Sequence, residues 1–227
     1  MELDDAIMTL RSMRRLTNDP PVTEEEIEHC LRAAVQAPSG GNVQPWQFVV
    51  LMDEDQRARV AEVYQRACAR YLAAIDAARP PSDDEEAEKS WQRSVGLTQH
   101  LADNLAETPI VLFVLTPYPN TLADDEGPID IGGLEASIFP AVQNFLLAAR
   151  GLGLGTTLTT LVKVYEDEIK EICGIKAHHE LVALVPVGRP LGTFGTPPRK
   201  PAEKVTSWDT YGNRRPFTTP PPGSAAN

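Results

Sequence analysis

The sequence is poor in basic residues and in cysteine. Its 227 residues include 21 Lys and Arg against 32 Asp and Glu, which gives a formal charge of −11. Because nucleic-acid binding depends on clustered cations that release counterions, we do not expect a general nucleic-acid binder. The three cysteines, Cys30, Cys68 and Cys173, are odd in number and widely spaced. This usage favours a reduced protein, and we expect a cytoplasmic location.

Long uninterrupted apolar stretches are also missing. The uncharged helical stretch 136–149 has 14 residues, whereas a membrane helix needs about 20 apolar residues. The first ten residues begin with acidic side chains rather than basic ones, so they do not resemble a secretory signal. We therefore expect no membrane span. With 42% hydrophobic residues, the chain can build one large core or share a core with a partner.

Several common catalytic motifs are absent. The sequence has no Gly-x-Ser-x-Gly nucleophile turn and no Gly-x-x-x-x-Gly-Lys-Ser/Thr phosphate loop. The one pair of adjacent histidines, His178 and His179, is expected to point apart and to share no metal ion. Gly151, Gly153 and Gly155 follow a predicted helix and precede a predicted strand, the reverse of the order in a Rossmann site. We therefore predict no metal centre and no Rossmann fingerprint.

Hydrophobic periodicity predicts more helix than strand, and hence the α+β class. Helices are expected from 3 into 11–15, from 23 to 38, from 53 to 79, from 82 through 101, over 134–150 and over 166–173. Strands are expected over 46–51, 109–115, 154–161 and 181–187. The helix starts rest on a capping box between Thr23 and Glu26 and on a cap at Asp53.

Three further segments have a distinct pattern. The stretch 134–150 is apolar on nearly every side, so it is expected at the centre of the subunit or between two subunits, with Gly151 as its stop. The turn-rich stretch 116–128 is predicted to be a long loop. The proline-rich end, 220–227, is predicted to be disordered.

A set of polar groups suits a phosphate and a flat heterocycle. Arg11, Ser12 and Arg14 lie within four residues, and Arg199 lies in a proline-bound segment of an otherwise acidic protein. The loop 38–42 offers backbone N–H groups, a hydroxyl and an amide beside a tryptophan. Taken singly, each feature is better explained as solvated charge or as an ordinary turn.

Together, five segments resemble the FMN-dependent nitroreductase family. In chain order they are Arg-Ser-Met-Arg at 11–14, Ala-Pro-Ser-Gly-Gly-Asn-Val-Gln-Pro-Trp at 37–46, Phe-Pro-Ala-Val-Gln-Asn at 139–144, Gly-Leu-Gly-Leu-Gly-Thr-Thr at 151–157 and Pro-Val-Gly-Arg-Pro at 186–190. The second segment is the most specific of the five. We expect a nitroreductase-like FMN-binding domain over 1–205 and a partly disordered C-terminal extension over 206–227.

The resemblance implies an α+β fold in which helices flank a central, mostly antiparallel sheet, in an intertwined homodimer with FMN sites at the interface. It assigns the FMN phosphate and ribityl chain to Arg11, Ser12, Arg14 and Arg199. It assigns a loop from the other subunit to Pro38, Ser39 and Asn42. It assigns the strand that faces flavin N5 and O4 to Thr159, Thr160 and Leu161.

The activity implied by the resemblance is reduction of nitroaromatic or quinone compounds by NAD(P)H, in a ping-pong hydride transfer through flavin N5. Because the cofactor carries this chemistry, no catalytic side chain is predicted. Two alternatives stay open: a flavin-fragmenting, dehalogenating or desaturating enzyme of the same fold, and a non-catalytic FMN store or sensor. The sequence departs from some members at His100 and Asp103, where those members place an amide and a lysine toward the flavin. The segments 79–90 and 116–130, which usually cover the substrate, also vary in length among such proteins.

Overall fold

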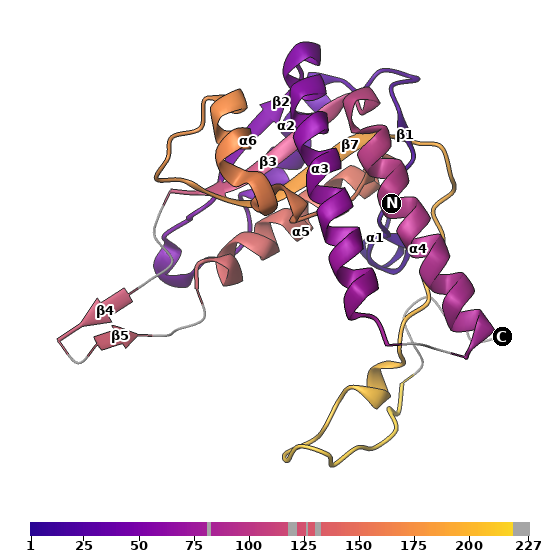
Figure 1. Ribbon diagram of the computed structural model, residues 1–227. Coiled ribbons are helices and arrows are strands. Elements are labelled where there is room, and N and C mark those ends of the chain that lie inside the picture. Colours follow the sequence, from indigo (N-terminus) through magenta and orange to yellow (C-terminus); the bar gives the residue numbers. More distant parts are fainter. Residues whose placement is uncertain (81–82, 118–121, 126, 130–132, 220–227) are drawn as a thin grey trace. The chain divides into compact units, whose positions relative to one another are not determined.

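A computed structural model describes residues 1–80, 83–117, 122–125, 127–129 and 133–219. The chain divides into two compact units. The larger unit is the continuous segment Ser12–Thr193, which contains the main sheet (Figure 1). The other unit joins Met1–Arg11 to the residues from Phe194 onward. None of the helices in the described ranges is long and apolar enough to cross a membrane.

The main sheet of the larger unit is antiparallel at every pairing. Its order is β1 (Leu16–Thr17), β7 (Glu180–Pro190), β3 (Ile110–Thr116) and β2 (Gln47–Leu51), and β6 (Gly155–Thr156) also pairs with β7. The long central strands β3 and β7 are almost entirely buried. This arrangement confirms the predicted antiparallel sheet.

Helices cover both faces of the sheet. One face packs against α2 (Glu24–Ala34) and α5 (Glu135–Gly151), and the other packs against α3 (Glu54–Ala78), α4 (Glu85–Asp103) and α6 (Glu166–Cys173). Alternate side chains of β3 enter the two cores, Leu112 on the α5 side and Phe113 on the α3 side. A strand buried on both faces has no polar alternation, which explains its continuous apolar run and confirms the α+β class. The remaining elements are α1 (Leu3–Thr9), β4 (Leu122–Asp124), β5 (Gly127–Ile129) and the short 3-10 helices η1 (Gly40–Asn42), η2 (Leu105–Glu107), η3 (Leu161–Tyr165) and η4 (Ala202–Lys204).

The predicted helix caps are confirmed. At the start of α2, the Glu26 N–H donates to the Thr23 hydroxyl at 3.2 Å, and the Thr23 N–H donates to the Glu26 carboxylate at 3.0 Å. At the start of α3, the Gln56 N–H donates to the Asp53 carboxylate at 2.8 Å. Each cap satisfies backbone donors that the first helical turn leaves unpaired.

Two boundaries were predicted wrongly because partners distant in sequence decide them. The first helix does not run into 11–15, since α1 ends at Thr9 and Leu10 is already extended. The chain then becomes a strand along β7. The predicted strand 154–161 is reduced to β6 and a single bridge from Thr159 to Leu184, and the chain enters η3 at Leu161.

Two further expectations need correction. The stretch 116–128 is not a plain loop, since β4 and β5 pair as an antiparallel hairpin. Gly151 does not stop its helix but is the last residue of α5, and Gly153, with φ of +77°, is the residue in the left-handed region. Glycine populates that region without a steric penalty, so the chain leaves the helix there. The predicted disorder of 220–227 lies outside the described residues.

Within this chain, α5 is not buried all round. Ile138, Val142 and Phe145 are buried in the core, but Phe139 is 39% exposed and Gln143 is also exposed. Because the stretch 136–149 contains no charge, this leaves a partly apolar helix face uncovered.

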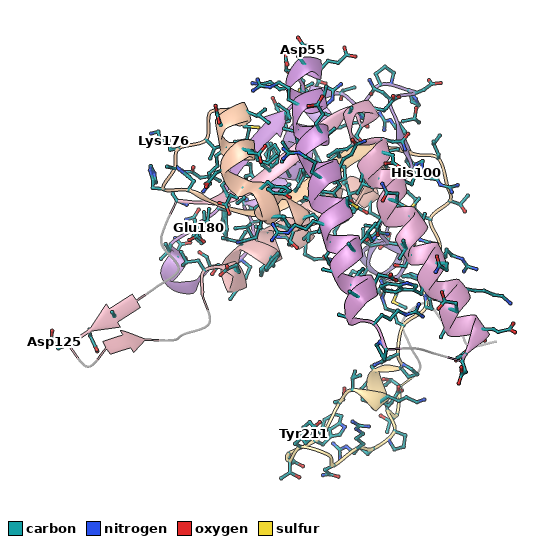
Figure 2. All side chains as sticks on the ribbon, viewed as in Figure 1. Asp55, His100, Asp125, Lys176, Glu180 and Tyr211 are labelled. Carbon is teal, nitrogen blue, oxygen red and sulfur yellow. The ribbon has the colours of Figure 1, made fainter. Side chains whose placement is uncertain are left out.

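The C-terminal part of the smaller unit has a local fold of its own. The Trp208 N–H donates to the Asn213 carbonyl at 2.8 Å, and the Arg215 guanidinium lies 4.0 Å from the centre of the Trp208 ring. Phe217 meets the same ring edge to face. Tyr211 lies between these residues in the chain and is 97% exposed (Figure 2).

Candidate functional site

The segment 12–17 is fixed against the sheet by close backbone contacts. The Met13 N–H donates to the Thr156 carbonyl of β6 at 2.8 Å, and Met13 itself is buried. A Cβ at Gly155 would lie 3.0 Å from the Met13 Cβ, and a Cβ at Gly188 would lie 2.9 Å from the Leu16 Cβ. Only glycine allows approaches this close. The two glycines therefore make the groove in which this segment lies.

Arg14 is available to bind an anion. Its side chain is partly buried, and within the described part of the chain no carboxylate pairs with it or with Arg11. In a protein with an excess of eleven negative charges, an unpaired cation on a fixed segment suits a phosphate. Ser12, two residues before Arg14, is exposed.

Tyr64 links two of the predicted site segments. Its hydroxyl lies 3.0 Å from the Thr159 hydroxyl, and its ring is buried in α3. Burial raises the pKa of Tyr64 to about 12, while the hydrogen bond to Thr159 and the charge of Arg14 act to lower it. The hydroxyl of Thr159 is therefore the hydrogen-bond partner of a buried phenol, and the charge of Arg14 acts on the same phenol. The residues around Tyr64 in the sequence do not indicate this contact, because its partner lies 95 residues away.

The segment that was predicted to face the flavin, 159–161, lies where the chain passes from a bridge with β7 into η3. Thr159 exchanges both backbone hydrogen bonds with Leu184, at 2.9 and 2.8 Å. The Leu161 N–H lies 3.4 Å from the Thr159 hydroxyl, and Thr160 between them is exposed. Nearby, Thr157 is buried, and no described residue hydrogen-bonds its hydroxyl. A buried polar atom without a partner is one that a bound ligand can satisfy.

The loop after α2 is built as an ordered, exposed polar turn. The Ser39 hydroxyl accepts from the Gln44 N–H at 3.0 Å, and the Gln44 amide donates to the Asn42 side chain at 3.2 Å. The Gly40 N–H donates to the Ser137 hydroxyl at 3.2 Å, which ties the loop to α5. Asn42 and Gln44 have φ of +56° and +51°. A backbone in this region costs energy and is held only by its surroundings. Pro38, Ser39 and Asn42 are thus presented together at the surface.

The remaining predicted residues belong to the unit formed by the two chain ends. Arg11 and Arg199 are both exposed, and the Arg199 guanidinium donates to the Pro198 carbonyl at 3.0 Å. Their part in the cofactor site stays a prediction.

His100 and Asp103 lie on the last turn of α4, where Figure 2 labels His100. Asp103 is exposed and accepts from the Gln99 amide at 2.8 Å. Burial and then the charge of Asp103 raise the pKa of Cys68, a buried residue of α3.

The cysteines do not suit nucleophilic chemistry. Burial raises the pKa of Cys30 to about 12 and that of Cys173 to about 11. The thiol, rather than the nucleophilic thiolate, is then the form present near neutral pH.

The histidine pair does not point apart as predicted. The rings of His178 and His179 have centroids 4.4 Å apart, because His179 turns inward to place its Nε2 atom 2.7 Å from the Gln47 amide oxygen. Across the described ranges, no three His, Cys, Asp or Glu side chains form a group that could hold a metal ion. An open depression of about 750 Å³ lies beside this pair, over η3 and α6, and includes none of the predicted site residues.

Comparison with known proteins identifies the family to which the chain belongs. Residues 7–189 match the nitroreductase family, and the chain belongs to that family. Human iodotyrosine deiodinase 1 is 25% identical over 207 residues, which cover 86% of this chain and 64% of the human protein. The chain therefore spans less than two thirds of the length of that relative.

Two solved structures are similar to the fold. Oxidized iodotyrosine deiodinase bound to FMN and 3-iodo-L-tyrosine superimposes with a TM-score of 0.67 at 24% identity, covering 88% of this chain and 96% of the other. A BluB-like flavoprotein from Clostridium difficile also gives 0.67, at 23% identity, covering 92% and 100%. At these identities the likeness shows the α+β nitroreductase-like fold.

Proposed function

We propose that this chain is an FMN-dependent oxidoreductase that reduces nitroaromatic or quinone compounds with NAD(P)H. The observation that carries the proposal is Arg14, an unpaired cation on a segment fixed in its groove by Gly155 and Gly188. Membership of the nitroreductase family and the FMN bound to its structural neighbour support it.

The chain's own residues would bind and orient the cofactor. The phosphate carries about −1.5 to −2 charges, and Arg14 with Ser12 would bind it. Segment 159–161 would face the ring system with its backbone, and bound FMN would supply the two-electron chemistry. No side-chain nucleophile is then needed, which agrees with the raised pKa values of Cys30 and Cys173.

A second copy of the chain would complete the site. The uncovered face of α5 exposes Phe139, and the loop hydrogen-bonded to α5 exposes Val43. An uncharged face of this kind suits an interface between subunits. The same loop would then offer Pro38, Ser39 and Asn42 to the cofactor of the partner, in a homodimer.

Removing the charge of Arg14 tests the proposal. Because a hydrogen bond to a charged group contributes about 1.5–3 kcal/mol, Arg14→Ala is expected to weaken FMN binding by about 10- to 100-fold. Riboflavin, which has no phosphate, should bind almost equally well before and after the change. Arg15→Ala is the matched control, because Arg15 is adjacent and exposed and its carbonyl oxygen accepts from the Leu191 N–H. Equal losses for FMN and riboflavin in Arg14→Ala would assign the residue to folding instead.

Turnover is tested by following NAD(P)H oxidation with 4-nitrobenzoate or 1,4-benzoquinone as acceptor. If donor and acceptor use one face of the flavin in turn, double-reciprocal plots at several acceptor concentrations should be parallel. A protein that binds FMN but oxidises NAD(P)H with neither acceptor would be a store or sensor.

Reductive dehalogenation is the second candidate. It is favoured by the likeness to iodotyrosine deiodinases, which extends over 86% of this chain. The same protein should then release iodide from an iodophenol when its flavin is reduced with dithionite. Iodide release without reduction of the nitro or quinone acceptor would replace the first proposal.

A further inference from the structure

The hydroxyl of Tyr64 does more than fill the core. The ring is 1% exposed and lies among the apolar residues of α3, where a phenylalanine would pack equally well. A buried phenol must satisfy its hydroxyl, and the partner here is the Thr159 hydroxyl at 3.0 Å, 95 residues along the chain. The hydroxyl therefore makes a specific long-range contact that apolar packing does not require.

Thr159 is held from three directions. Its backbone is fixed by Leu184 of β7, and its hydroxyl meets both Tyr64 of α3 and the Leu161 N–H. The bonds to Leu184 fix the backbone of Thr159 on the sheet, but they do not orient its hydroxyl. The Tyr64 hydroxyl and the Leu161 N–H together fix the side chain and the next peptide.

The Tyr64 hydroxyl suits a positional role. Burial raises its pKa to about 12, and its hydrogen-bond partner is another hydroxyl, that of Thr159. A neutral, buried hydroxyl can orient the group to which it is hydrogen-bonded.

We propose that Tyr64 is a positioning residue for the flavin ring, because its hydroxyl fixes the Thr159 side chain and hence the 159–161 turn. This inference rests on the proposed function, since only a bound flavin gives that turn something to orient. In this proposal α3 contributes to the cofactor site through the hydroxyl of Tyr64.

The test is Tyr64→Phe in the full chain loaded with FMN. The ring and its packing are kept, so we expect FMN affinity to change by less than about threefold and the unfolding midpoint to fall only slightly. The visible flavin absorption band and the midpoint potential should both shift. Flavin reduction at saturating NAD(P)H should slow by about 3- to 10-fold, the effect of one neutral hydrogen bond.

Two further variants make the test specific. Tyr71→Phe is the matched control, because Tyr71 lies on the same helix but is 42% exposed, and it should leave the flavin spectrum and potential unchanged. Thr159→Val removes the same hydrogen bond from its other end, together with the contact to the Leu161 N–H, and should shift the flavin spectrum at least as far as Tyr64→Phe. Adding Tyr64→Phe to Thr159→Val should then cause no further change, because the bond between the two hydroxyls is already lost.

The possible outcomes distinguish a failure of the proposed role of Tyr64 from a failure of the proposed function. If the wild-type chain takes up no FMN, the proposed function and this inference both fail. If the wild type binds FMN and Tyr64→Phe keeps the wild-type spectrum, potential and reduction rate, only the role of Tyr64 is refuted. Additive effects of Tyr64→Phe and Thr159→Val would refute it equally, since they would show that the two hydroxyls act separately. Should Tyr64→Phe fail to fold, the spectrum and potential of Thr159→Val decide the question.

Discussion

Gly155→Ala tests whether the segment that carries Arg14 depends on a close approach to β6. The added Cβ would lie 2.7 Å from the Leu16 Cδ2, 3.0 Å from the Met13 Cβ and 3.1 Å from the Pro190 Cβ. The Leu16 methyl ends a flexible side chain and can rotate away. The other two atoms are attached directly to backbone, so segment 12–17 or the end of β7 must move by a few tenths of an ångström.

The expected magnitude follows from these contacts. Overpacking a tight site costs about 1–3 kcal/mol, which urea unfolding of the apoprotein should measure as a loss of unfolding free energy. Because the displaced segment carries Arg14, FMN affinity should fall as well, measured by quenching of flavin fluorescence. Gly151→Ala is the matched control from the same glycine motif: it ends α5, and a Cβ there meets nothing within 4 Å. Its stability should stay unchanged or rise by up to about 1 kcal/mol.

Two outcomes would contradict the role given to the close approach at Gly155. If Gly155→Ala binds FMN as tightly as wild type at unchanged stability, the contact with segment 12–17 does not hold Arg14 in place. If Gly151→Ala loses as much as Gly155→Ala, the motif acts through chain flexibility rather than through close approach.

Three other substitutions probe separate parts of the structure. Thr23→Ala removes the first cap of α2 and should lower the unfolding free energy by about 1 kcal/mol in urea titrations; no loss would show that the capping box adds nothing. Burial raises the pKa of Glu26, but the hydrogen bonds from Arg189 and from the Thr23 N–H, together with the charge of Arg189, outweigh it and leave that pKa below its ordinary value of 4.5. The stability that the lowered pKa provides is present above pH 4.5 and is lost as pH falls through the lowered pKa. The acid-induced drop in the urea midpoint should therefore be shallower in Arg189→Gln than in the wild type. An equally steep drop would assign the acid sensitivity to other carboxylates. Phe139→Asp places a charge on the uncovered face of α5 and should convert a dimer of twice 24.8 kDa to monomer in light scattering, and an intact dimer would place the interface elsewhere.

Local signals in the sequence predicted the elements that local chemistry decides. The caps at Thr23 and Asp53 require side chains only three residues apart, and the apolar run of β3 reports burial on both faces. Neither depends on knowing the topology. These elements were therefore predicted close to their observed boundaries.

The errors share one physical cause, which is pairing with residues far away in sequence. Residues 11–15 have helical spacing, but the Met13 N–H finds the Thr156 carbonyl, and β1 pairs with β7. No local pattern specifies that partner. The same holds for Tyr64, whose apolar surroundings are visible in the helix periodicity while its contact with Thr159 is not.

The structure explains the spacing of the three glycines at 151, 153 and 155. As a dinucleotide fingerprint the spacing of Gly151, Gly153 and Gly155 is wrong, and the structure gives each glycine a different task. Gly151 is the last helical residue of α5, Gly153 lets the chain leave the helix at φ of +77°, and Gly155 allows segment 12–17 to approach the sheet closely. A site whose chemistry belongs to a bound cofactor needs few reactive side chains, but its cations and backbone donors must be held in fixed positions. In this chain the close approach at Gly155 and the long-range contact of Tyr64 would hold them there. Substitutions at residues that do not touch the cofactor should therefore alter the binding and the reactivity of the cofactor.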